Sequence, residues 1–443
     1  MNSTPPSPSF LQAFLFWFKL GFISFGGPAG QIALMHQELV ERRRWISERR
    51  FLHALNYCML LPGPEAQQLA TYIGWLMHKT RGGVAAGVLF VLPSLLILIV
   101  LSWLYIAFGD MPLMLGLFYG IKPAVTAIVL QAVHRIGSRA LKNAYLWSIA
   151  AASFVAIFIL NLPFPVIVAV AALLGYIGGR VKPAQFKTGG MHSASEKSFG
   201  AALIDDDTPS PAHARFSWWR LAQVLLVGAL LWMLPMAALL SLLGWEHTIT
   251  QMAWFFTKAA LLTFGGAYAV LPYVYQGAVG YYGWLTPTQM IDGLALGETT
   301  PGPLIMVVAF VAFVGAYVKA AFGADQLFLA GAVAAIVVTW FTFLPSFIFI
   351  LVGGPLVEST HNDLKFTAPL TAITAAVVGV ILNLALFFAY HVLWPTSWAG
   401  AFDPLAALIA LAAAIALLRY KANVMLVIAV CAVVGLLVKM LAH

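Results

Sequence analysis

The sequence predicts an all-α polytopic membrane protein made of two inverted-topology repeats. Three observations carry this prediction: an apolar composition, a self-similarity between the two halves of the chain, and an unequal share of basic residues between those halves. Hydrophobic residues make up 62% of the 443 residues and charged residues only 9%. Soluble domains are far more polar, so we expect the bilayer to be the solvent of this chain.

Long uncharged runs identify the membrane segments. Five such runs cover residues 82–109, 143–179, 221–245, 326–357 and 366–402. Each run exceeds the roughly 20 apolar residues that one helical span needs, and several are long enough for two spans.

The chain is an internal duplication. A shift of 239 positions places Phe25-Gly26-Gly27 on Phe264-Gly265-Gly266 and Pro62-Gly63-Pro64 on Pro301-Gly302-Pro303 without a gap. Leu92-Pro93-Ser94 matches Leu344-Pro345-Ser346 once the second copy is allowed 13 more residues. Two copies of one unit are therefore expected.

The copies are predicted to have opposite orientations in the membrane. Between its two motifs the first copy carries Arg42, Arg43, Arg44, Arg49 and Arg50, whereas the matching residues 267–300 include no Lys or Arg. By the positive-inside rule the first loop is cytoplasmic and the second is not.

Glycine and proline motifs that break helices predict re-entrant hairpins. We expect hairpins over 10–41 and 48–78, then spans near 83–108, 113–132, 145–161 and 164–179, a connecting span near 219–243, and second-copy spans near 327–352, 367–390, 404–418 and 423–441. This gives about nine full spans plus four hairpin arms, and whether the arms cross fully is left open. The predicted domains are a first repeat (1–179), a flexible cytoplasmic linker (180–218), a connecting transmembrane helix (219–245) and a second, inverted repeat (246–443).

Other classes of protein are disfavoured. Cys58 and Cys431 stand alone in apolar sequence, and metal-ligand spacings, nucleophile elbows and phosphate-binding loops are lacking, so we expect no cofactor, no metal and no enzymatic activity. The net charge of +8 comes from short basic clusters between apolar runs, which fits topology better than nucleic-acid binding.

Broken helices that meet between inverted repeats are typical of secondary transporters, and freed N–H groups at helix ends favour anions. Lys19 and Lys258 precede equivalent Gly-Gly pairs and predict one oxyanion site. The predicted substrate-binding residues are Lys19, Ser24, Gly26, Gly27, Pro62, Gly63, Pro64, Lys258, Thr263, Gly265, Gly266, Thr300, Pro301, Gly302 and Pro303. Residues predicted to line the site or to couple transport to a counter-ion such as a proton are Asn56, Glu65, Gln67, Lys122 and Glu298.

Each of these residues has a structural alternative. The lysines could snorkel to an interface, the glycines could serve close helix packing, and Ser24 and Thr263 could bond back to their own helices. The expected partners are a small inorganic oxyanion and membrane lipids, and the oligomeric state is left open, with a homodimer as one option.

The ordered motifs resemble those of the chromate ion transporter family in its long, two-domain form. The resemblance is carried by residues 24–28 (SFGGP), 45–47 (WIS), 61–64 (LPGP), 81–83 (RGG) and 92–94 (LPS), and by the second-copy motifs. It implies an inner-membrane protein that exports chromate and gives chromate resistance, with sulfate as a similar competitor. A departure is Ala267, which stands where the first copy has Pro28. The alternatives are a permease for sulfate or another small oxyanion, and a lipid-phosphate enzyme or flippase with re-entrant helices.

Overall fold

The structure, a computed structural model, describes residues 5–186, 199–209, 211–359, 367–395 and 400–441, and within these ranges every regular element is a helix. The helices are α1 (Phe10–Ile23), α2 (Gly27–His36), η1 (Gln37–Arg42), α3 (Glu48–Cys58), α4 (Glu65–Phe108), α5 (Pro112–Ala140), α6 (Ala144–Phe158), α7 (Phe164–Val181), α8 (Pro183–Phe186), η2 (Ala212–Ala214), α9 (Trp218–Leu243), α10 (Thr248–Leu261), α11 (Ala267–Tyr275), η3 (Gln276–Tyr281), α12 (Pro287–Thr299), η4 (Leu304–Met306), α13 (Val307–Val318), η5 (Ala324–Gln326), α14 (Leu327–Ser359), α15 (Thr367–Leu393), α16 (Pro404–Leu418) and α17 (Val424–Leu441). The prediction of an all-α polytopic membrane protein is confirmed.

Seven of the described helices are long and apolar enough to cross a membrane, and they are α4, α5, α7, α9, α14, α15 and α17. These correspond to seven of the nine predicted spans. The other two, α6 and α16, are apolar helices of 15 residues each, which is short of the roughly 20 residues of a full span.

The two halves repeat the same local structure at the predicted spacing of 239 residues. The π-helices η1 and η3 begin and end at equivalent residues, and each is followed by a tryptophan whose N–H returns to the helix, from Trp45 to Leu39 at 2.8 Å and from Trp284 to Ala278 at 2.7 Å. The next helix is capped in both halves by a hydroxyl, that of Ser47 on α3 and that of Thr286 on α12. The duplication therefore extends to helix caps and irregular turns.

The chain reverses inside α4. His78 and Lys79 leave helical geometry, with φ −132° and +57°, and divide α4 into two arms. The arms pack closely, because a Cβ on Gly74 would lie 2.5 Å from the Gly82 carbonyl oxygen. In the second half α13 and α14 take the places of these arms.

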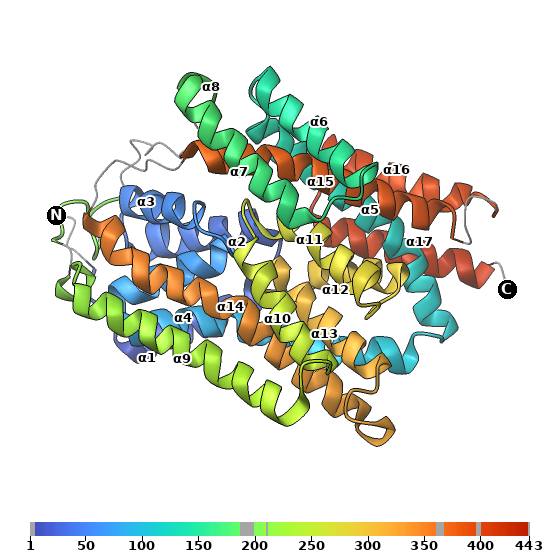
Figure 1. Cartoon of the computed structure of the whole chain (residues 1–443), viewed down its shortest axis with the longest axis horizontal. Coiled ribbons are helices and arrows are strands. Elements are labelled where there is room, and N and C mark those ends of the chain that lie inside the picture. Colours follow the sequence, from blue (N-terminus) through green and yellow to red (C-terminus); the bar gives the residue numbers. More distant parts are fainter. Residues whose placement is uncertain (1–4, 187–198, 210, 360–366, 396–399, 442–443) are drawn as a thin grey trace.

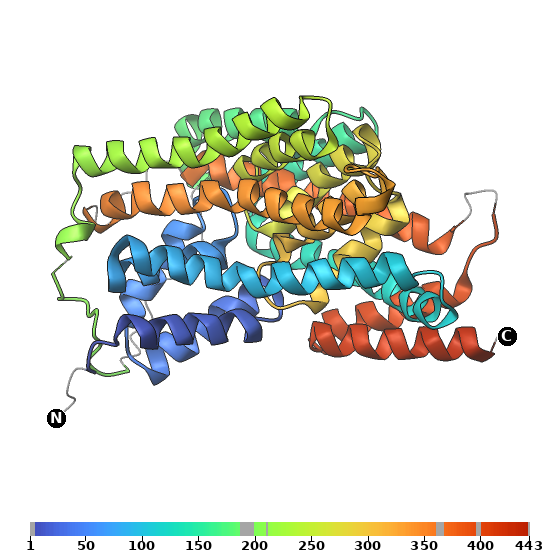
Figure 2. The same ribbon diagram turned by 90° about the horizontal axis from the view of Figure 1, so that it is seen from below.

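The two halves exchange helices. The first-half helix α5 packs on α16 and α17, and the second-half helix α15 packs on α6 and α7. Glycines allow close contact, since a Cβ on Gly120 of α5 would overlap the Cys431 carbonyl of α17. Figures 1 and 2 show the resulting bundle, in which the long helices α4, α14 and α9 lie side by side.

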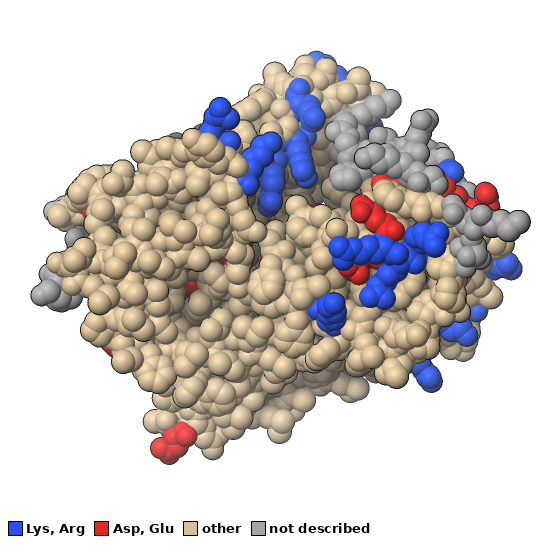
Figure 3. All heavy atoms as spheres, turned by 180° about the vertical axis from the view of Figure 1, so that it is seen from behind, with Lys and Arg blue, Asp and Glu red and all other residues tan. Residues whose placement is uncertain are grey.

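The linker was expected to be flexible, but its described part is docked. Leu203 and Ile204 donate backbone hydrogen bonds to Arg44 and Trp45, and the Ser47 hydroxyl bonds Asp206 at 2.6 Å. Figure 3 shows the face of the molecule that is turned away from the viewer in Figure 1. On this face the Lys and Arg side chains gather over the centre and toward the end of the molecule that carries α1 and α3.

Candidate functional site

Glycines with positive φ interrupt the helices at the predicted motifs. Gly26 precedes α2 and Gly27 begins it, with φ of 86° and 67°, and Gly265 and Gly266 separate α10 from α11 with φ of 81° and 97°. Gly63 and Gly302 adopt φ of 127° and 96° between their proline neighbours. Residues with a side chain rarely adopt these angles, so the breaks depend on glycine.

The four breaks meet in pairs across the two halves. The N–H of Gly63 donates to the Thr263 carbonyl at 2.7 Å, and the N–H of Gly302 donates to the Ser24 carbonyl at 2.8 Å. We call these two contacts the crossings. They are equivalent under the 239-residue shift, so each half closes the break of the other half.

Small hydroxyl residues complete both crossings. A Cβ on Gly63 would lie 2.4 Å from the Ser346 hydroxyl, and one on Gly302 would lie 2.9 Å from the Ser94 side chain. Ser94 and Ser346 belong to the equivalent Leu-Pro-Ser motifs. The loops thus approach α4 and α14 so closely that only glycine fits.

The hydroxyls of Ser24 and Thr263 bond back to their own helices. Each donates to the carbonyl four residues earlier, Leu20 and Ala259, at 2.7 Å. The Thr300 hydroxyl likewise donates to Gly297 at 3.1 Å. In this structure these hydroxyl hydrogens are therefore engaged, and only the oxygen lone pairs are available to a ligand.

Glutamines of the first half add polar contacts at both crossings. The Gln31 amide donates to the carbonyls of Ser24 and Gly302, and the Gln68 amide donates to the Pro62 carbonyl at 2.8 Å. Gln67 bonds Thr71 within α4 at 3.0 Å, and Asn56 lies half-buried on α3. The carbonyl oxygens of the side chains of Gln31, Gln67 and Gln68 are buried and accept no hydrogen bond within the described part of the chain.

A cluster of charged side chains lies beside the crossings. We call it the carboxylate–arginine cluster, and it comprises Glu65, Arg135, Arg139, Tyr268 and Glu298. Glu65 follows the first Pro-Gly-Pro motif and lies 3.9 Å from the place of a Cβ on Gly266, at the break of the other half.

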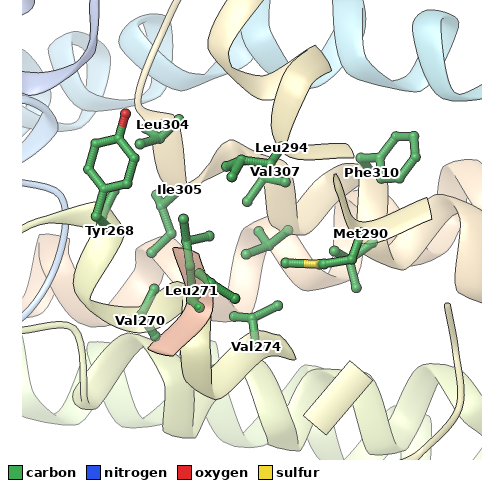
Figure 4. Close-up of a cluster of buried hydrophobic side chains, with 14 of the residues drawn as sticks. Tyr268, Val270, Leu271, Val274, Met290, Leu294, Leu304, Ile305, Val307 and Phe310 are labelled. Atoms are coloured by element: carbon green, nitrogen blue, oxygen red, sulfur yellow. The ribbon is translucent and has the colours of Figure 1, made fainter. Parts of the chain in front are cut away.

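Glu298, only 7% exposed, accepts a hydrogen bond from the Tyr268 hydroxyl. The guanidinium of Arg135 on α5 lies 5.9 Å from the centre of the Tyr268 ring and near enough to Glu65 and Glu298 for their charges to act on one another, although it forms no ion pair within 4 Å with either described carboxylate. Arg139 interacts with Glu65. Figure 4 shows Tyr268 at the edge of an apolar core with its hydroxyl directed away from that core. One arginine therefore lies near two carboxylates that come from different halves.

Sequence reasoning did not select Arg135, Arg139 or Tyr268. The expected span ended near residue 132, which left both arginines in a cytoplasmic loop, whereas α5 continues to Ala140. Arg135 follows Gln131 by one helical turn, so polar residues at helical spacing at the end of an apolar run were the available signal. Tyr268 gave no signal, because its equivalent is Ala29.

The predicted lysines lie apart from the crossings' hydrogen bonds. Lys19 is exposed on α1, and Lys258 is half-buried with its Nζ 5.7 Å from the centre of the Trp254 ring. Lys122 is paired with Asp292, with 3.5 Å between Nζ and Oδ1. Among the described residues no group of three or more His, Cys, Asp or Glu side chains could hold a metal ion.

The arrangement suits a small anion. A guanidinium offers several N–H donors, and in a low-dielectric setting its charge offsets much of the hydration that a bound anion loses.

Comparison with known proteins gives a consistent result. Residues 11–176 and 250–436 match the chromate transporter family, once in each half. The chain is 33% identical over 383 residues to a chromate transport protein of Pseudomonas aeruginosa, covering 86% of this chain and 81% of that protein. It is 28% identical over 442 residues to a chromate transport protein of Cupriavidus metallidurans, covering 99% and 96%, and 27% identical over 377 residues to a probable chromate transport protein of Synechococcus elongatus, covering 85% and 84%. No solved structure matches the chain.

Proposed function

The chain belongs to the chromate transporter family, and from this premise we propose that it is a secondary transporter that exports chromate across the inner membrane and so gives chromate resistance. The observation that carries the proposal is Arg135, a half-buried cation near Glu65 and Glu298 beside the two crossings that forms no ion pair within 4 Å with either of these described carboxylates. Chromate is a tetrahedral dianion, and a partly buried guanidinium with unengaged N–H donors is suited to bind it.

The membrane potential supports the direction of transport. With the cytoplasm negative, moving a dianion outward is favoured by about 4.6 kcal/mol for every 100 mV. Export of chromate therefore needs no further energy source, although a coupled counter-ion such as a proton would modify the gradient that the protein can sustain.

Sulfate is the expected competitor, because it has the same shape and charge as chromate. The carboxylate–arginine cluster recognises both features through charge and N–H donors, and neither distinguishes chromium from sulfur. We therefore expect sulfate to slow chromate export, and a permease for sulfate is the alternative function.

The test is chromate uptake into everted membrane vesicles, in which export appears as accumulation. Arg135→Gln should lower uptake at least about tenfold at equal protein abundance, which corresponds to about 1.4 kcal/mol, and Arg135→Lys should keep part of the activity. Arg215→Gln, at an exposed linker position, is the matched control and should leave uptake unchanged.

Three outcomes count against the proposal. Wild-type vesicles that accumulate chromate no faster than vesicles without the protein would exclude chromate export. Labelled sulfate taken up faster than chromate, with chromate a weak inhibitor, would make the sulfate permease the better description. Full activity of Arg135→Gln would remove Arg135 from the site.

A further inference from the structure

A second charged group repeats the design of the carboxylate–arginine cluster on the same two helices. Lys122 of α5 lies 3.5 Å from the carboxylate of Asp292 on α12, and the Tyr105 hydroxyl donates to the same carboxylate at 2.9 Å. In the first cluster the corresponding groups are Arg135 of α5, Glu298 of α12 and the Tyr268 hydroxyl. Each group therefore places a cation of α5 near a carboxylate of α12 that accepts a hydrogen bond from a tyrosine, but only Lys122 forms an ion pair with its carboxylate.

The two groups are separated along the helices. Lys122 and Arg135 are about 20 Å apart along α5, and Asp292 and Glu298 are about 9 Å apart along α12, at 1.5 Å per residue. Because α5 and α12 contact each other and run the same way from the second group to the first, the groups form successive positions along one helix pair.

Lys122 of the second group lines a cavity of about 830 Å³ between α5, α12, α15, α16 and α17. Lys122 lines it together with Thr288, His391, Asp403 and Lys439. The cavity lies toward the C-terminal end of α17, on the side of the molecule opposite α1 and α3 (Figure 1). An anion that leaves the first cluster along α5 and α12 in this direction would reach Lys122 and then this cavity.

We propose that Lys122, Asp292 and Tyr105 form a second oxyanion station, through which the transported dianion passes between the carboxylate–arginine cluster and the cavity. This inference rests on the proposed transport function. Asp292 holds Lys122 while the station is empty, and an arriving dianion takes its place beside Lys122. Tyr105 keeps its hydrogen bond to Asp292, so the buried carboxylate, whose residue is 2% exposed, retains a partner throughout.

The geometry of the pair fits such an exchange. The 3.5 Å separation exceeds the 2.7–2.9 Å of a tight charge-assisted hydrogen bond, and Asp292 Oδ1 has no hydrogen bond within the described residues. Lys122 is thus held loosely. A pathway conducts only if each position binds the ion well enough to receive it and weakly enough to release it, and a paired lysine meets both conditions.

The experiment measures transport and site occupancy separately. In a background with Cys58→Ala and Cys431→Ala, Thr288→Cys is placed one helical turn before Asp292 at an exposed position of the cavity. A membrane-impermeant maleimide labels it in intact cells, with sulfate as the protecting anion because chromate oxidises thiols.

We expect sulfate to slow labelling at least about threefold, and Lys122→Met to abolish this protection while Lys122→Arg retains it. Arg215→Gln, which removes an exposed cation outside this cavity, is the control and should leave protection intact. In everted vesicles Lys122→Met should lower kcat for chromate about tenfold with little change in KM, because the first cluster still binds the anion.

The outcomes separate this inference from the proposed function. Absence of chromate uptake by the wild type would overturn the function. Wild-type uptake with no sulfate protection, or with equal protection and uptake in Lys122→Met, would overturn the station alone. If Lys122→Met is not inserted, Asp292→Asn serves instead: freeing Lys122 should shift protection to lower sulfate concentration, and an unchanged concentration dependence would contradict the proposal.

Discussion

The two crossings share their backbone and differ in their side chains. Both close with an N–H of the Pro-Gly-Pro glycine on the carbonyl before a Gly-Gly pair, and both pack against a serine. The polar side chains around them are unequal. Under the 239-residue shift the equivalents of Gln31, Glu65 and Gln68 are Val270, Leu304 and Val307, and the equivalent of Glu298 is Met59.

This difference separates structure from function. Groups that both halves keep, such as the glycines and the backbone bonds, build the crossing. Side chains that are present in only one half are not needed to form a crossing, since the other half forms the same crossing without them. Glu65, Glu298 and the glutamines are therefore the side chains that remain for a role other than building the crossings.

The strongest test of the comparison is orientation. If the halves are inverted, Arg43→Cys should be labelled only from the cytoplasmic side and Gly283→Cys only from the opposite side, because only the first loop is basic. Labelling of single-cysteine variants in intact cells and in everted vesicles measures this. Access to both cysteines from one side would break the two-fold relation between the halves.

The next largest effect concerns what the crossings share. Gly63→Ala and Gly302→Ala each place a Cβ against a serine at a positive φ, so each should cost roughly 2–4 kcal/mol and greatly lower the yield of folded protein. Thermal unfolding in detergent, followed by size-exclusion chromatography, measures the loss. The control is Gly280→Ala, where a Cβ meets no atom within 4 Å. A large effect at only one crossing would mean that they are not equivalent.

Exchanging the unequal residues tests what differs. Glu65→Leu gives the first half the residue of the second, so it should keep the fold and lower chromate export about tenfold. Leu304→Glu should instead destabilise the protein by about 3 kcal/mol, because Leu304 is 2% exposed in an apolar core. Export at equal abundance and thermal stability are the two measurements. Normal export by Glu65→Leu would show that the asymmetry at this position has no role in transport.

Gln31→Val makes a smaller exchange of the same kind. It removes the amide that donates to the carbonyls of Ser24 and Gly302, and should cost about 1–2 kcal/mol with export lowered only a few fold. The unfolding temperature of the purified variant measures the cost. A stability equal to that of the wild type would mean that water replaces the amide at this crossing.

The smallest expected effect is that of Glu298→Gln. The amide keeps the size of the side chain and removes its titratable group, so the pH dependence of export should flatten while insertion is unchanged. Chromate uptake by everted vesicles between mildly acidic and mildly alkaline pH is the measurement. A pH profile that coincides with that of the wild type would exclude Glu298 from coupling to protons.

Sequence reasoning reached the helices and the breaks but not the way they meet. The apolar runs and the 239-residue repeat located the spans, the glycine motifs and the equivalent serines, because these features are local. The exchange of α5 and α15 between halves is not local, and it brings Arg135 near Glu298 and Lys122 to Asp292. Residues that pair across more than 60 positions lie on helices that are not neighbours in the sequence. Such a pair produces no hydrophobic periodicity or repeat by which one sequence could reveal it.

Lys19 and Lys258 also show that the surroundings of a residue are not predicted from the sequence repeat. Lys19 and Lys258 occupy equivalent positions, which suggested a shared site, yet α9 packs on α10 and has no counterpart on α1 among the described helices. Equivalent residues thus have different surroundings, with Lys19 exposed and Lys258 beside Trp254. Repeat symmetry predicts backbone position better than it predicts environment.

The crossings also set the order of events during synthesis. The first Pro-Gly-Pro loop donates to Thr263, which leaves the ribosome 200 residues after Gly63. At about 5–20 residues per second the inserted first half waits roughly 10–40 s with this N–H unpaired in the membrane. A chain that stalls in the linker would remain in that state, with an open polar loop that membrane quality control can recognise. Biogenesis of this protein therefore depends on the second half arriving beside a first half that has been inserted but is not yet closed.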